Sequence, residues 1–527
     1  RDRDSPLDMD ISFGSVTDNC VIDNFGRIAS RRGFQAYTDN PEILGGNPLV
    51  SVEEFLTGTG DSYLFATGNG NIYLQNRGTP DFNLVPLTLP GGYVINEDNW
   101  QIVGLNDKCF FVQAGHQALV FDPAVSTTAV ALWGEYPPGA PGNPNCVHAA
   151  FGRLWLSDFD DNKTIVYWSS LLDGEDWTDG GTGSLNTEEY WPSGFDEVTA
   201  IGAHNNFLVL YGKRNILLYT TTADVNNTIS LTDTVEGLGC MARDSVAPIG
   251  EDYLFIDATG VRSLARTIQE KSVPIGDISR NVRSDFQQAL RQEPTDNIKA
   301  VFHVEDSFYV CFLPSNPITF VFDTWSPLPE GAARVTQWNG VTVRCGTRLS
   351  DRTTLFGGRG GLYSYRGASD IVLDTDNANE PIVSSIPFRY VSHPLDFNGP
   401  ANLIFPKQVD VTLVGGLQGE LGLEWAYDYS EDFSYKAKNI TATSVPSQWN
   451  AELFPAGFGA EWNDPENEPG TVGVLGYWTS EGLNLNQLKY NIWGSGRNVK
   501  VGFRSNTTGS VVSIQEINVQ ALQGRLL

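Results

Sequence analysis

One pattern occurs seven times along this chain: an alternating apolar run, a tight polar or glycine-containing turn, and a second apolar run. Successive copies begin 44 to 54 residues apart, the length of one four-stranded propeller blade. The copies start at Tyr63, Cys109, Arg153, Phe207, Tyr253, Ser307 and Thr354. A two-stranded ribbon of this size cannot bury both apolar faces alone, whereas stacking around an axis buries them. The repeat therefore predicts an all-β fold built on a β-propeller.

Each copy has the pattern of a β-hairpin. In the first copy, Tyr63 and Phe65 alternate with Leu64 and Ala66, which is the period of a strand. Residues 68–71 then supply glycine and asparagine, which tolerate positive φ in a tight turn. A short apolar stretch precedes most hairpins, so each repeat holds at least three strands. We expect six or seven blades.

The chain divides into three predicted regions. Residues 1–45 are polar and show no complete repeat, so we expect an N-terminal arm. Residues 46–370 carry the repeats and form the predicted propeller. In residues 371–527 the apolar runs lengthen, and their period-two alternation predicts a C-terminal β-sandwich.

One stretch departs from the strand pattern. Apolar residues recur there at every fourth position, at Ile278, Val282, Phe286 and Leu290. Asp277 stands before them and can cap a helix N-terminus. We therefore expect a single amphipathic helix, packed between blades.

Acidic residues outnumber basic ones. The chain has 63 Asp and Glu against 34 Lys and Arg, a formal charge of −29, which argues against a generic basic cleft for nucleic acid. The charge is compatible with solubility alone and, in a ring, with a pore lined by carboxylates. No membrane span or secretion signal is expected from the apolar runs, although the first residue is Arg1 and a removed leader stays open.

Residue types for catalysis or metal binding are sparse. The five histidines are scattered, and none has a metal-ligand spacing. The six cysteines lack a CxxC pair, and Cys109 and Cys311 lie in apolar runs, so buried free thiols are expected, with disulfides as the alternative. We expect no catalytic residue, no cofactor and no metal ion.

A carbohydrate enzyme is an alternative, because propellers also serve as glycosidases. Residues 170–177, SLLDGEDW, resemble the Asp-box turn of sialidase blades, which is a structural turn. A sialidase-like site would need clustered arginines and a tyrosine nucleophile beside an acid. Candidate arginines are Arg31, Arg32, Arg243 and Arg262, and no sequence pattern brings them together.

A long insertion over residues 173–197 carries Trp177, Tyr190 and Trp191. It is too long for an ordinary connection, and such loops usually make contacts. The three aromatic residues are therefore candidate anchors of an interface between subunits. Burial within their own blade is the alternative.

Five segments carry a family resemblance through their order: Asn24–Phe34, Phe151–Trp177, Val198–Thr222, Val235–Leu264 and Val273–Phe286. They span most of residues 20–365, and in this order they resemble the tail hub or nozzle proteins of short-tailed bacteriophages, which include packaged-DNA stabilisation proteins. The resemblance implies a structural virion protein and not an enzyme. Residues 371–527 would then form the nozzle-tip domain.

Proteins of that family assemble as a homo-hexameric ring below the portal and adaptor, continue the DNA channel, retain the packaged genome and permit its ejection. The implied partners are further copies of the chain, adaptor and portal-side tail proteins, tail fibre, spike or needle proteins, and transiting double-stranded DNA bound without sequence specificity. The implied location is the phage tail, assembled in the host cytoplasm. The alternatives are a glycoside hydrolase, and a propeller that binds a glycan or protein without chemistry.

Overall fold

The computed structural model describes residues 13–525 except 24, 77–81, 135–136, 193, 222–228, 251, 271–276, 317, 329–330, 342, 374–380, 398–401, 417–418 and 441–484. These residues form two compact units. The first contains Thr17–Asn19 and Arg32–Ser384, and the second contains Cys20–Arg31 and Ser385–Leu527. The described residues of the expected N-terminal arm, residues 1–45, are therefore divided between the units, and the later boundary falls at Ser384 instead of residue 370.

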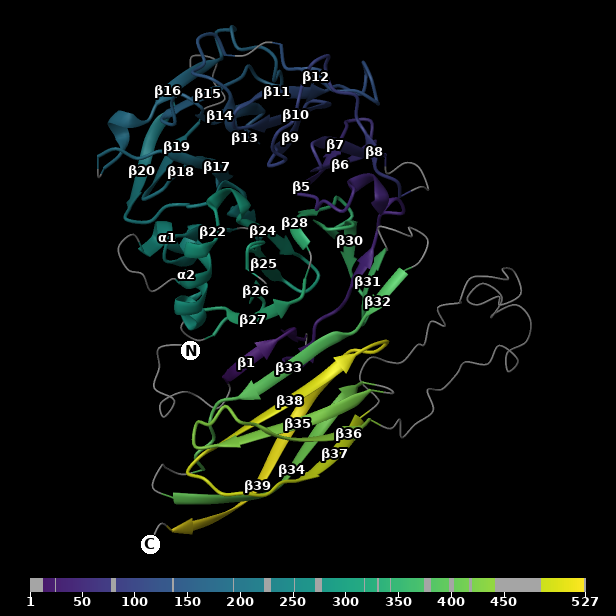
Figure 1. Ribbon diagram of the computed structural model, residues 1–527. Coiled ribbons are helices and arrows are strands. Elements are labelled where there is room, and N and C mark those ends of the chain that lie inside the picture. Colours follow the sequence, from purple (N-terminus) through teal and green to yellow (C-terminus); the bar gives the residue numbers. More distant parts are fainter. Residues whose placement is uncertain are drawn as a thin grey trace, which may run out of the picture. The chain divides into compact units, whose positions relative to one another are not determined.

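The first unit is a β-propeller of seven sheets, which we number as blades 1 to 7 (Figure 1). Blades 1 and 2 contain β5 (Ser51–Leu56), β6 (Ser62–Gly68), β7 (Asn71–Asn76), β8 (Val85–Pro86), then β9 (Gln101–Leu105), β10 (Lys108–Gln113), β11 (His116–Phe121) and β12 (Ala131–Leu132). Blades 3 and 4 contain β13 (Pro144–Ala150), β14 (Arg153–Phe159), β15 (Ile165–Trp168), β16 (Gly183–Asn186), then β17 (Val198–His204), β18 (Phe207–Gly212), β19 (Asn215–Thr220) and β20 (Ser230–Glu236).

The remaining blades are less uniform. Blade 5 has three strands: β21 (Ala247–Pro248), β22 (Tyr253–Asp257) and β23 (Gly260–Ser263). Blade 6 contains β24 (Lys299–His303), β25 (Phe308–Phe312), β26 (Ile318–Asp323) and β27 (Arg334–Asn339), and β1 (Gly14–Asp18) ends in a parallel pairing of Asp18 with Gln337. Blade 7 contains β28 (Val343–Arg348), β29 (Thr354–Gly358), β30 (Gly361–Tyr365), β4 (Phe34–Ala36), β31 (Asp370–Leu373) and β32 (Pro381–Ser384).

The hairpins have the geometry that their turn residues allow. In blade 1, Gly68 pairs with Asn71 across a turn in which Asn69 and Gly70 have φ of 53° and 66°. The ring closes because the first strand of each blade contacts that of the next, with the short helix η3 (Arg243–Ser245) between β17 and β24. The number of blades is thus seven, the larger of the two expected values.

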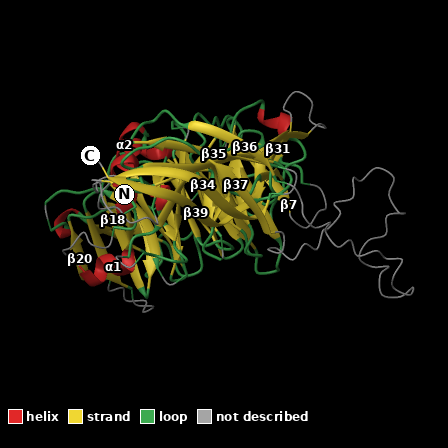
Figure 2. Cartoon of the chain, turned by 90° about the horizontal axis from the view of Figure 1, so that it is seen from below, coloured by secondary structure: helices red, strands yellow, loops and turns green. Residues whose placement is uncertain are grey.

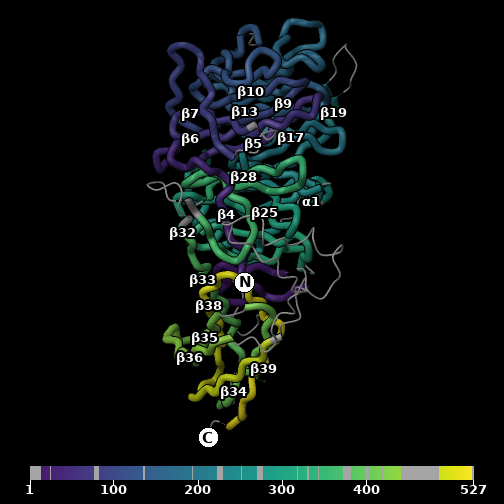
Figure 3. The backbone as a smooth tube through the Cα atoms, turned by 90° about the vertical axis from the view of Figure 1, so that its right-hand side faces the viewer, coloured from purple at the N-terminus to yellow at the C-terminus, as the bar shows by residue number. Residues whose placement is uncertain are grey.

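Blade 7 is completed by the N-terminal strand β4, which lies between β30 and β31 in the strand order of the sheet. Figure 3 shows β4, in purple, in the region of the green strands β28 and β32 of the same blade. Gln35 pairs with Ser364 in antiparallel and with Ile371 in parallel. The neighbouring Phe34 ring packs edge-on against Phe356 at a centroid distance of 5.4 Å. The two ends of the propeller sequence are therefore joined within one sheet.

The predicted helix exists, but it begins later than expected. α2 spans Arg283–Gln292, and its buried Phe286 and Leu290 share one apolar cluster with residues of blades 5 and 6. Asp277 does not cap α2, and its carboxylate accepts hydrogen bonds from Ser279. The short 3-10 helix η5 (Arg280–Val282) precedes α2, and Val282 holds the N-cap position. A second helix, α1 (Leu264–Glu270), was not expected.

The second unit is a two-sheet β-sandwich. One sheet contains β33 (Ile386–Ser392), β38 (Val499–Thr507), β35 (Glu420–Tyr427) and β36 (Ser434–Asn439). The other contains β2 (Cys20–Ile22), β3 (Ile28–Ser30), β39 (Val512–Arg525), β34 (Asn402–Gly415) and β37 (Leu485–Asn491). The long strands β34 and β39 run side by side (Figure 2). Alternate residues such as Val409, Val411 and Leu423 face the core between the sheets.

All six cysteines are buried and none forms a disulfide, as expected for small apolar core residues. Burial raises the pKa of the Cys240 thiol to about 11. The Cys240 thiol is therefore protonated at neutral pH.

Candidate functional site

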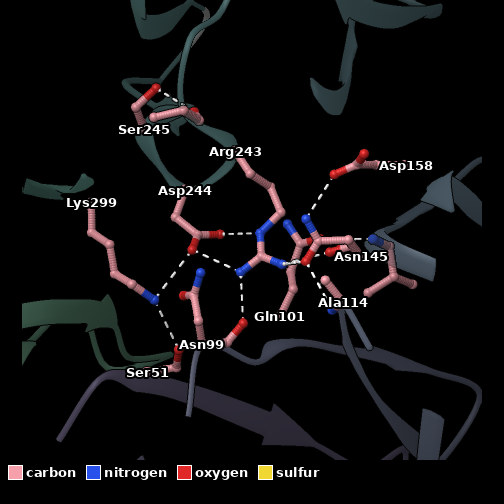
Figure 4. A network of polar contacts seen from close by, with 12 residues as sticks. Ser51, Asn99, Gln101, Ala114, Asn145, Asp158, Arg243, Asp244, Ser245 and Lys299 are labelled. Atoms are coloured by element: carbon pink, nitrogen blue, oxygen red, sulfur yellow. Dashed lines mark hydrogen bonds and ion pairs between the residues drawn. The ribbon is translucent and has the colours of Figure 1, made fainter. Parts of the chain in front are cut away.

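Side chains of the short helix η3 occupy the centre of the propeller. Ser245 fixes this short helix: its hydroxyl donates to the Ala242 carbonyl oxygen at 2.7 Å, and its carbonyl accepts the Tyr309 hydroxyl at 2.7 Å. The residues just before η3 include the buried Cys240 and Ala242, so the start of this helix is anchored in the apolar core. Arg243 and Asp244 then project toward the first strands of the other blades (Figure 4).

Arg243 links three blades through its guanidinium group (Figure 4). Nε and Nη2 each donate to Asp244 at 2.9 Å, in the two-pronged geometry that suits a carboxylate. Nη2 also donates to the Asn99 carbonyl oxygen at 2.9 Å, just before blade 2. Nη1 donates to Oδ1 of Asn145 in blade 3 at 2.7 Å. The side chain is only 7% exposed, so these bonds lie in a low-dielectric environment.

Lys299 extends the network to two more blades. Its Nζ lies 3.2 Å from Oδ2 of Asp244 and donates to Oγ of Ser51 in blade 1 at 2.9 Å. Burial alone would raise the pKa of Asp244, but Arg243 and Lys299 outweigh it and hold that pKa well below its usual range. We call Arg243, Asp244 and Lys299 the central network; with its partners it connects blades 1, 2, 3, 5 and 6.

A titratable carboxyl group lies at the junction of blades 1 and 7. Glu53 of β5 is half-buried and accepts a hydrogen bond from the Thr347 hydroxyl of β28 at 3.1 Å. Burial raises the pKa of Glu53 to about 7, and the charges of Glu54 and Asp244 add to this effect. In blade 3, burial lowers the pKa of His148 to about 4. Near neutral pH, Glu53 is therefore poised between its charged and neutral forms.

The central network holds blades together and leaves Asp244 little freedom for chemistry. Both carboxylate oxygens of Asp244 are already bound by cations. The candidate arginines have different partners: Arg32 lies near Glu305 and Asp306, and Arg262 donates to Thr259. Within the described ranges, no group of three or more His, Cys, Asp or Glu could hold a metal ion. Over the same residues, no helix is both long and apolar enough to cross a membrane.

The structure places the three predicted aromatic anchors in different environments. Trp177 is 6% exposed and packs against Trp133 at 5.8 Å, in the core between blades 2 and 3. Trp191 is 5% exposed, in the core between blades 3 and 4. Tyr190 is 41% exposed. The structure does not gather the three residues on one surface, and Tyr190 is the one that reaches solvent.

Sequence reasoning missed the central network. The sequence offers Arg243 only as a candidate arginine, and it places Asp244 and Lys299 in short strand-like stretches without a role for their charges. A signal was present: Arg243 and Asp244 form a charged pair inside the otherwise apolar or small stretch 238–248. Buried charges of this kind are paired in folded proteins, so the pair pointed to an internal ion pair.

No family model and no curated protein sequence matches the chain. The chain is similar to PorZ of the type-IX secretion system of Porphyromonas gingivalis, with 12% identity over 68% of this chain and a TM-score of 0.36, and it spans 43% of the PorZ chain. It is also similar to the WD40 β-propeller domain of Doa1 (10% identity, 64% of this chain, 96% of that chain, TM-score 0.34) and to YCF48 from Cyanidioschyzon merolae (10%, 61%, 96%, 0.28).

Proposed function

We propose that this chain is a non-enzymatic structural subunit of the tail of a short-tailed phage. It would form a homo-hexameric hub or nozzle ring below the portal and adaptor, continue the DNA channel, retain the packaged genome and permit its ejection. Its neighbours would be adaptor and portal-side proteins and tail fibre, spike or needle proteins. It would act in the virion after assembly in the host cytoplasm.

The filled centre of the propeller is the observation that supports this proposal. Arg243, Asp244 and Lys299 bond to one another and to the first strands of the surrounding blades. A DNA duplex therefore has no path through a single propeller, and a channel must be enclosed by several copies. In such an assembly each propeller is a rigid wall segment.

Charge is the second support. A subunit with a formal charge of −29 gives a ring whose walls repel phosphate groups. Repulsion keeps DNA from adhering during ejection. Of the predicted anchors, exposed Tyr190 is the one we retain for contact between subunits.

Cryo-electron microscopy of the purified chain, and of the particle that contains it, tests the proposal. We expect a six-fold ring whose central channel is in line with a portal. Separate propellers in both samples would contradict the proposal. A ring with a channel lined by Lys and Arg would support the proposed assembly but contradict the proposed repulsion between the channel wall and DNA.

A glycoside hydrolase uses a pair of carboxyl groups, one of them an acid with a raised pKa. Glu53 has such a pKa, but Asp244, whose charge acts on Glu53, is already bound by two cations and is not free to be its partner. Incubation of the same material with a panel of glycans and sialosides tests this alternative. Turnover that is lost in Glu53→Gln would replace the structural proposal with an enzymatic one. We expect no turnover.

A further inference from the structure

Three exposed apolar side chains come from neighbouring positions of blade 3, because Leu171 and Leu172 lie over Gly152, the residue after Phe151. Phe151, Leu171 and Leu172 are 38%, 51% and 54% exposed. Phe151 is in the turn between β13 and β14, and the two leucines follow β15. We call these three residues the apolar patch. Contiguous apolar surface rimmed by polar residues is typical of a binding site.

The backbone of the patch is unusual for its residue types. Phe151 and Leu172 have φ of 54° and 58°, the left-handed region that bulky side chains rarely adopt. Such strain persists only where the surrounding structure enforces it, and it is concentrated at functional sites.

The neighbouring blades show what the fold alone requires at this turn. The equivalent turns are Asn106-Asp107 in blade 2 and Asn205-Asn206 in blade 4, with φ between 46° and 65°. Asparagine suits this conformation because its side chain tolerates it. Blade 3 has Phe151 where blades 2 and 4 have asparagine, so the phenylalanine serves something other than the turn.

The patch is held in place by its surroundings. The Leu172 amide donates to the Gly152 carbonyl oxygen at 2.7 Å, and Asn106 Nδ2 donates to the Leu172 carbonyl oxygen at 2.8 Å. Leu171 lies directly over Gly152, where an added Cβ would come within 2.9 Å of its Cδ1. Buried Trp177 anchors the far end of the same loop. The three apolar side chains are thus presented on a fixed support.

Negative charge borders the patch. Three exposed carboxylates lie beside it. Asp173 follows Leu172 in the chain, and Asp179 accepts a hydrogen bond from the hydroxyl of Ser170, the residue before Leu171. Asp107 follows Asn106, whose side chain donates to Leu172, and its carboxylate also accepts the Gly58 amide. Basic side chains nearby already have partners: Lys108 binds Glu175, and Arg153 donates to the carbonyl oxygens of Ser169 and Gly181. A second copy of a chain with a formal charge of −29 is a poor match to this border.

We propose that the apolar patch of blade 3 is a docking site for a basic, amphipathic protein segment, whose apolar side chains cover Phe151, Leu171 and Leu172 and whose cations face the bordering aspartates. The assignment stands on the geometry and charge of blade 3 and holds whether or not the chain forms a ring.

Binding of model peptides tests the assignment. The probe is a fluorescein-labelled helical peptide of about 18 residues with leucine on one face and lysine on the other. Two comparison peptides replace leucine by serine or lysine by glutamate. By fluorescence anisotropy in about 150 mM NaCl, we expect the Leu/Lys peptide to bind at least about tenfold more tightly than either comparison peptide.

The double variant Phe151→Asn, Leu172→Asn separates the patch from the overall charge. Both residues have positive φ, which asparagine tolerates, so we expect an unchanged or higher thermal midpoint and loss of the preference for leucine. The matched control is Val125→Asn, at an 83% exposed valine of blade 2, and we expect it to bind like the wild type.

Three results would overturn the assignment. One is equal binding of the Leu/Lys peptide by the wild type and a folded double variant. Another is equal binding of the Leu/Glu and Leu/Lys peptides, which would show that the patch does not select a basic partner. The third is self-association in sedimentation velocity that the double variant abolishes, which would assign the patch to a second copy.

Discussion

At the scale of single residues, Arg243 links several blades of the propeller. Its guanidinium bonds reach Asn99, Asn145 and Asp244, which belong to different blades or their connections. Arginine suits this position because its planar group offers five donors in a fixed arrangement. A lysine could supply the charge but not the simultaneous contacts.

Arg243→Leu is expected to lower the free energy of unfolding by about 3 kcal/mol, because Asp244 would lose its two-pronged partner in a buried site. Denaturant unfolding at neutral pH measures this. The control is Lys213→Gln, which removes an exposed ion pair with Glu197 and should cost less than about 0.5 kcal/mol. Equal effects of the two variants would show that the central network contributes no special stability.

Glu53 is expected to make stability depend on pH. Its pKa is 4.5 as an ordinary group and about 7 in the fold, so the folded state favours the protonated form. Stability is therefore fully present at acid pH and is lost as the pH rises through about 7. Glu53→Gln cannot ionise, and we expect it to differ least from the wild type near pH 5 and to be clearly more stable near pH 8.

Thr347→Val provides the companion measurement. The Thr347 hydroxyl lowers the pKa of Glu53 by stabilising its charged form, so its loss should deepen the fall in stability at high pH. Thermal unfolding of all three proteins between about pH 5 and pH 8 gives the comparison. A difference between Glu53→Gln and wild type that is constant over this range would refute the assignment.

At the scale of elements, the sequence predicts the hairpins, but it does not predict how strand β4 closes the propeller ring. Residues 63–76 show alternation and a turn within one short window, so local physics determines the hairpin. β4 has three residues, and its partners in β30 and β31 are more than 300 positions away, so it leaves no local pattern. The central network escaped prediction for the same reason, because it joins residues from five blades. The start of α2 was misplaced because Ile278 shares the helical period without being helical.

Gln35→Pro is expected to weaken blade 7 by about 3 kcal/mol, because β4 is an interior strand of its sheet and proline removes a ladder hydrogen bond there. Hydrogen exchange of β30 and β31 would rise first, and the unfolding midpoint would fall. Gln35→Ala is the control, since it removes only the side-chain hydrogen bond to Ser369. If alanine costs as much as proline, the strand pairing of β4 is not what closes the ring.

At the scale of the whole molecule, charge is the dominant property. The chain as a whole has 63 Asp and Glu against 34 Lys and Arg, and copies of it repel one another in dilute salt. Assembly must therefore rely on contacts strong enough to offset that repulsion. Formation of the proposed ring should therefore change with salt concentration in a direction that the charge predicts.

Ring formation is expected to increase with salt, because screening weakens repulsion between subunits that each have a formal charge of −29. Mass photometry at about 50 mM and about 500 mM NaCl measures the fraction in rings. Sodium sulfate at matched ionic strength is the control for effects of the particular anion. Rings that dissociate at high salt would show that interface ion pairs outweigh the general repulsion.

The late pairing of early strands has a consequence for synthesis of the protein. β3 pairs with β39, and Ser30 accepts a hydrogen bond from the Val512 amide, 482 positions later. In the same way, β4 cannot pair until β30 and β31 have been synthesised. On the ribosome, the first strands emerge long before their partners and stay unpaired until translation is nearly finished. A nascent chain of this protein thus carries open strand edges for most of its time on the ribosome, and a chaperone that shields them should raise the yield of folded subunits.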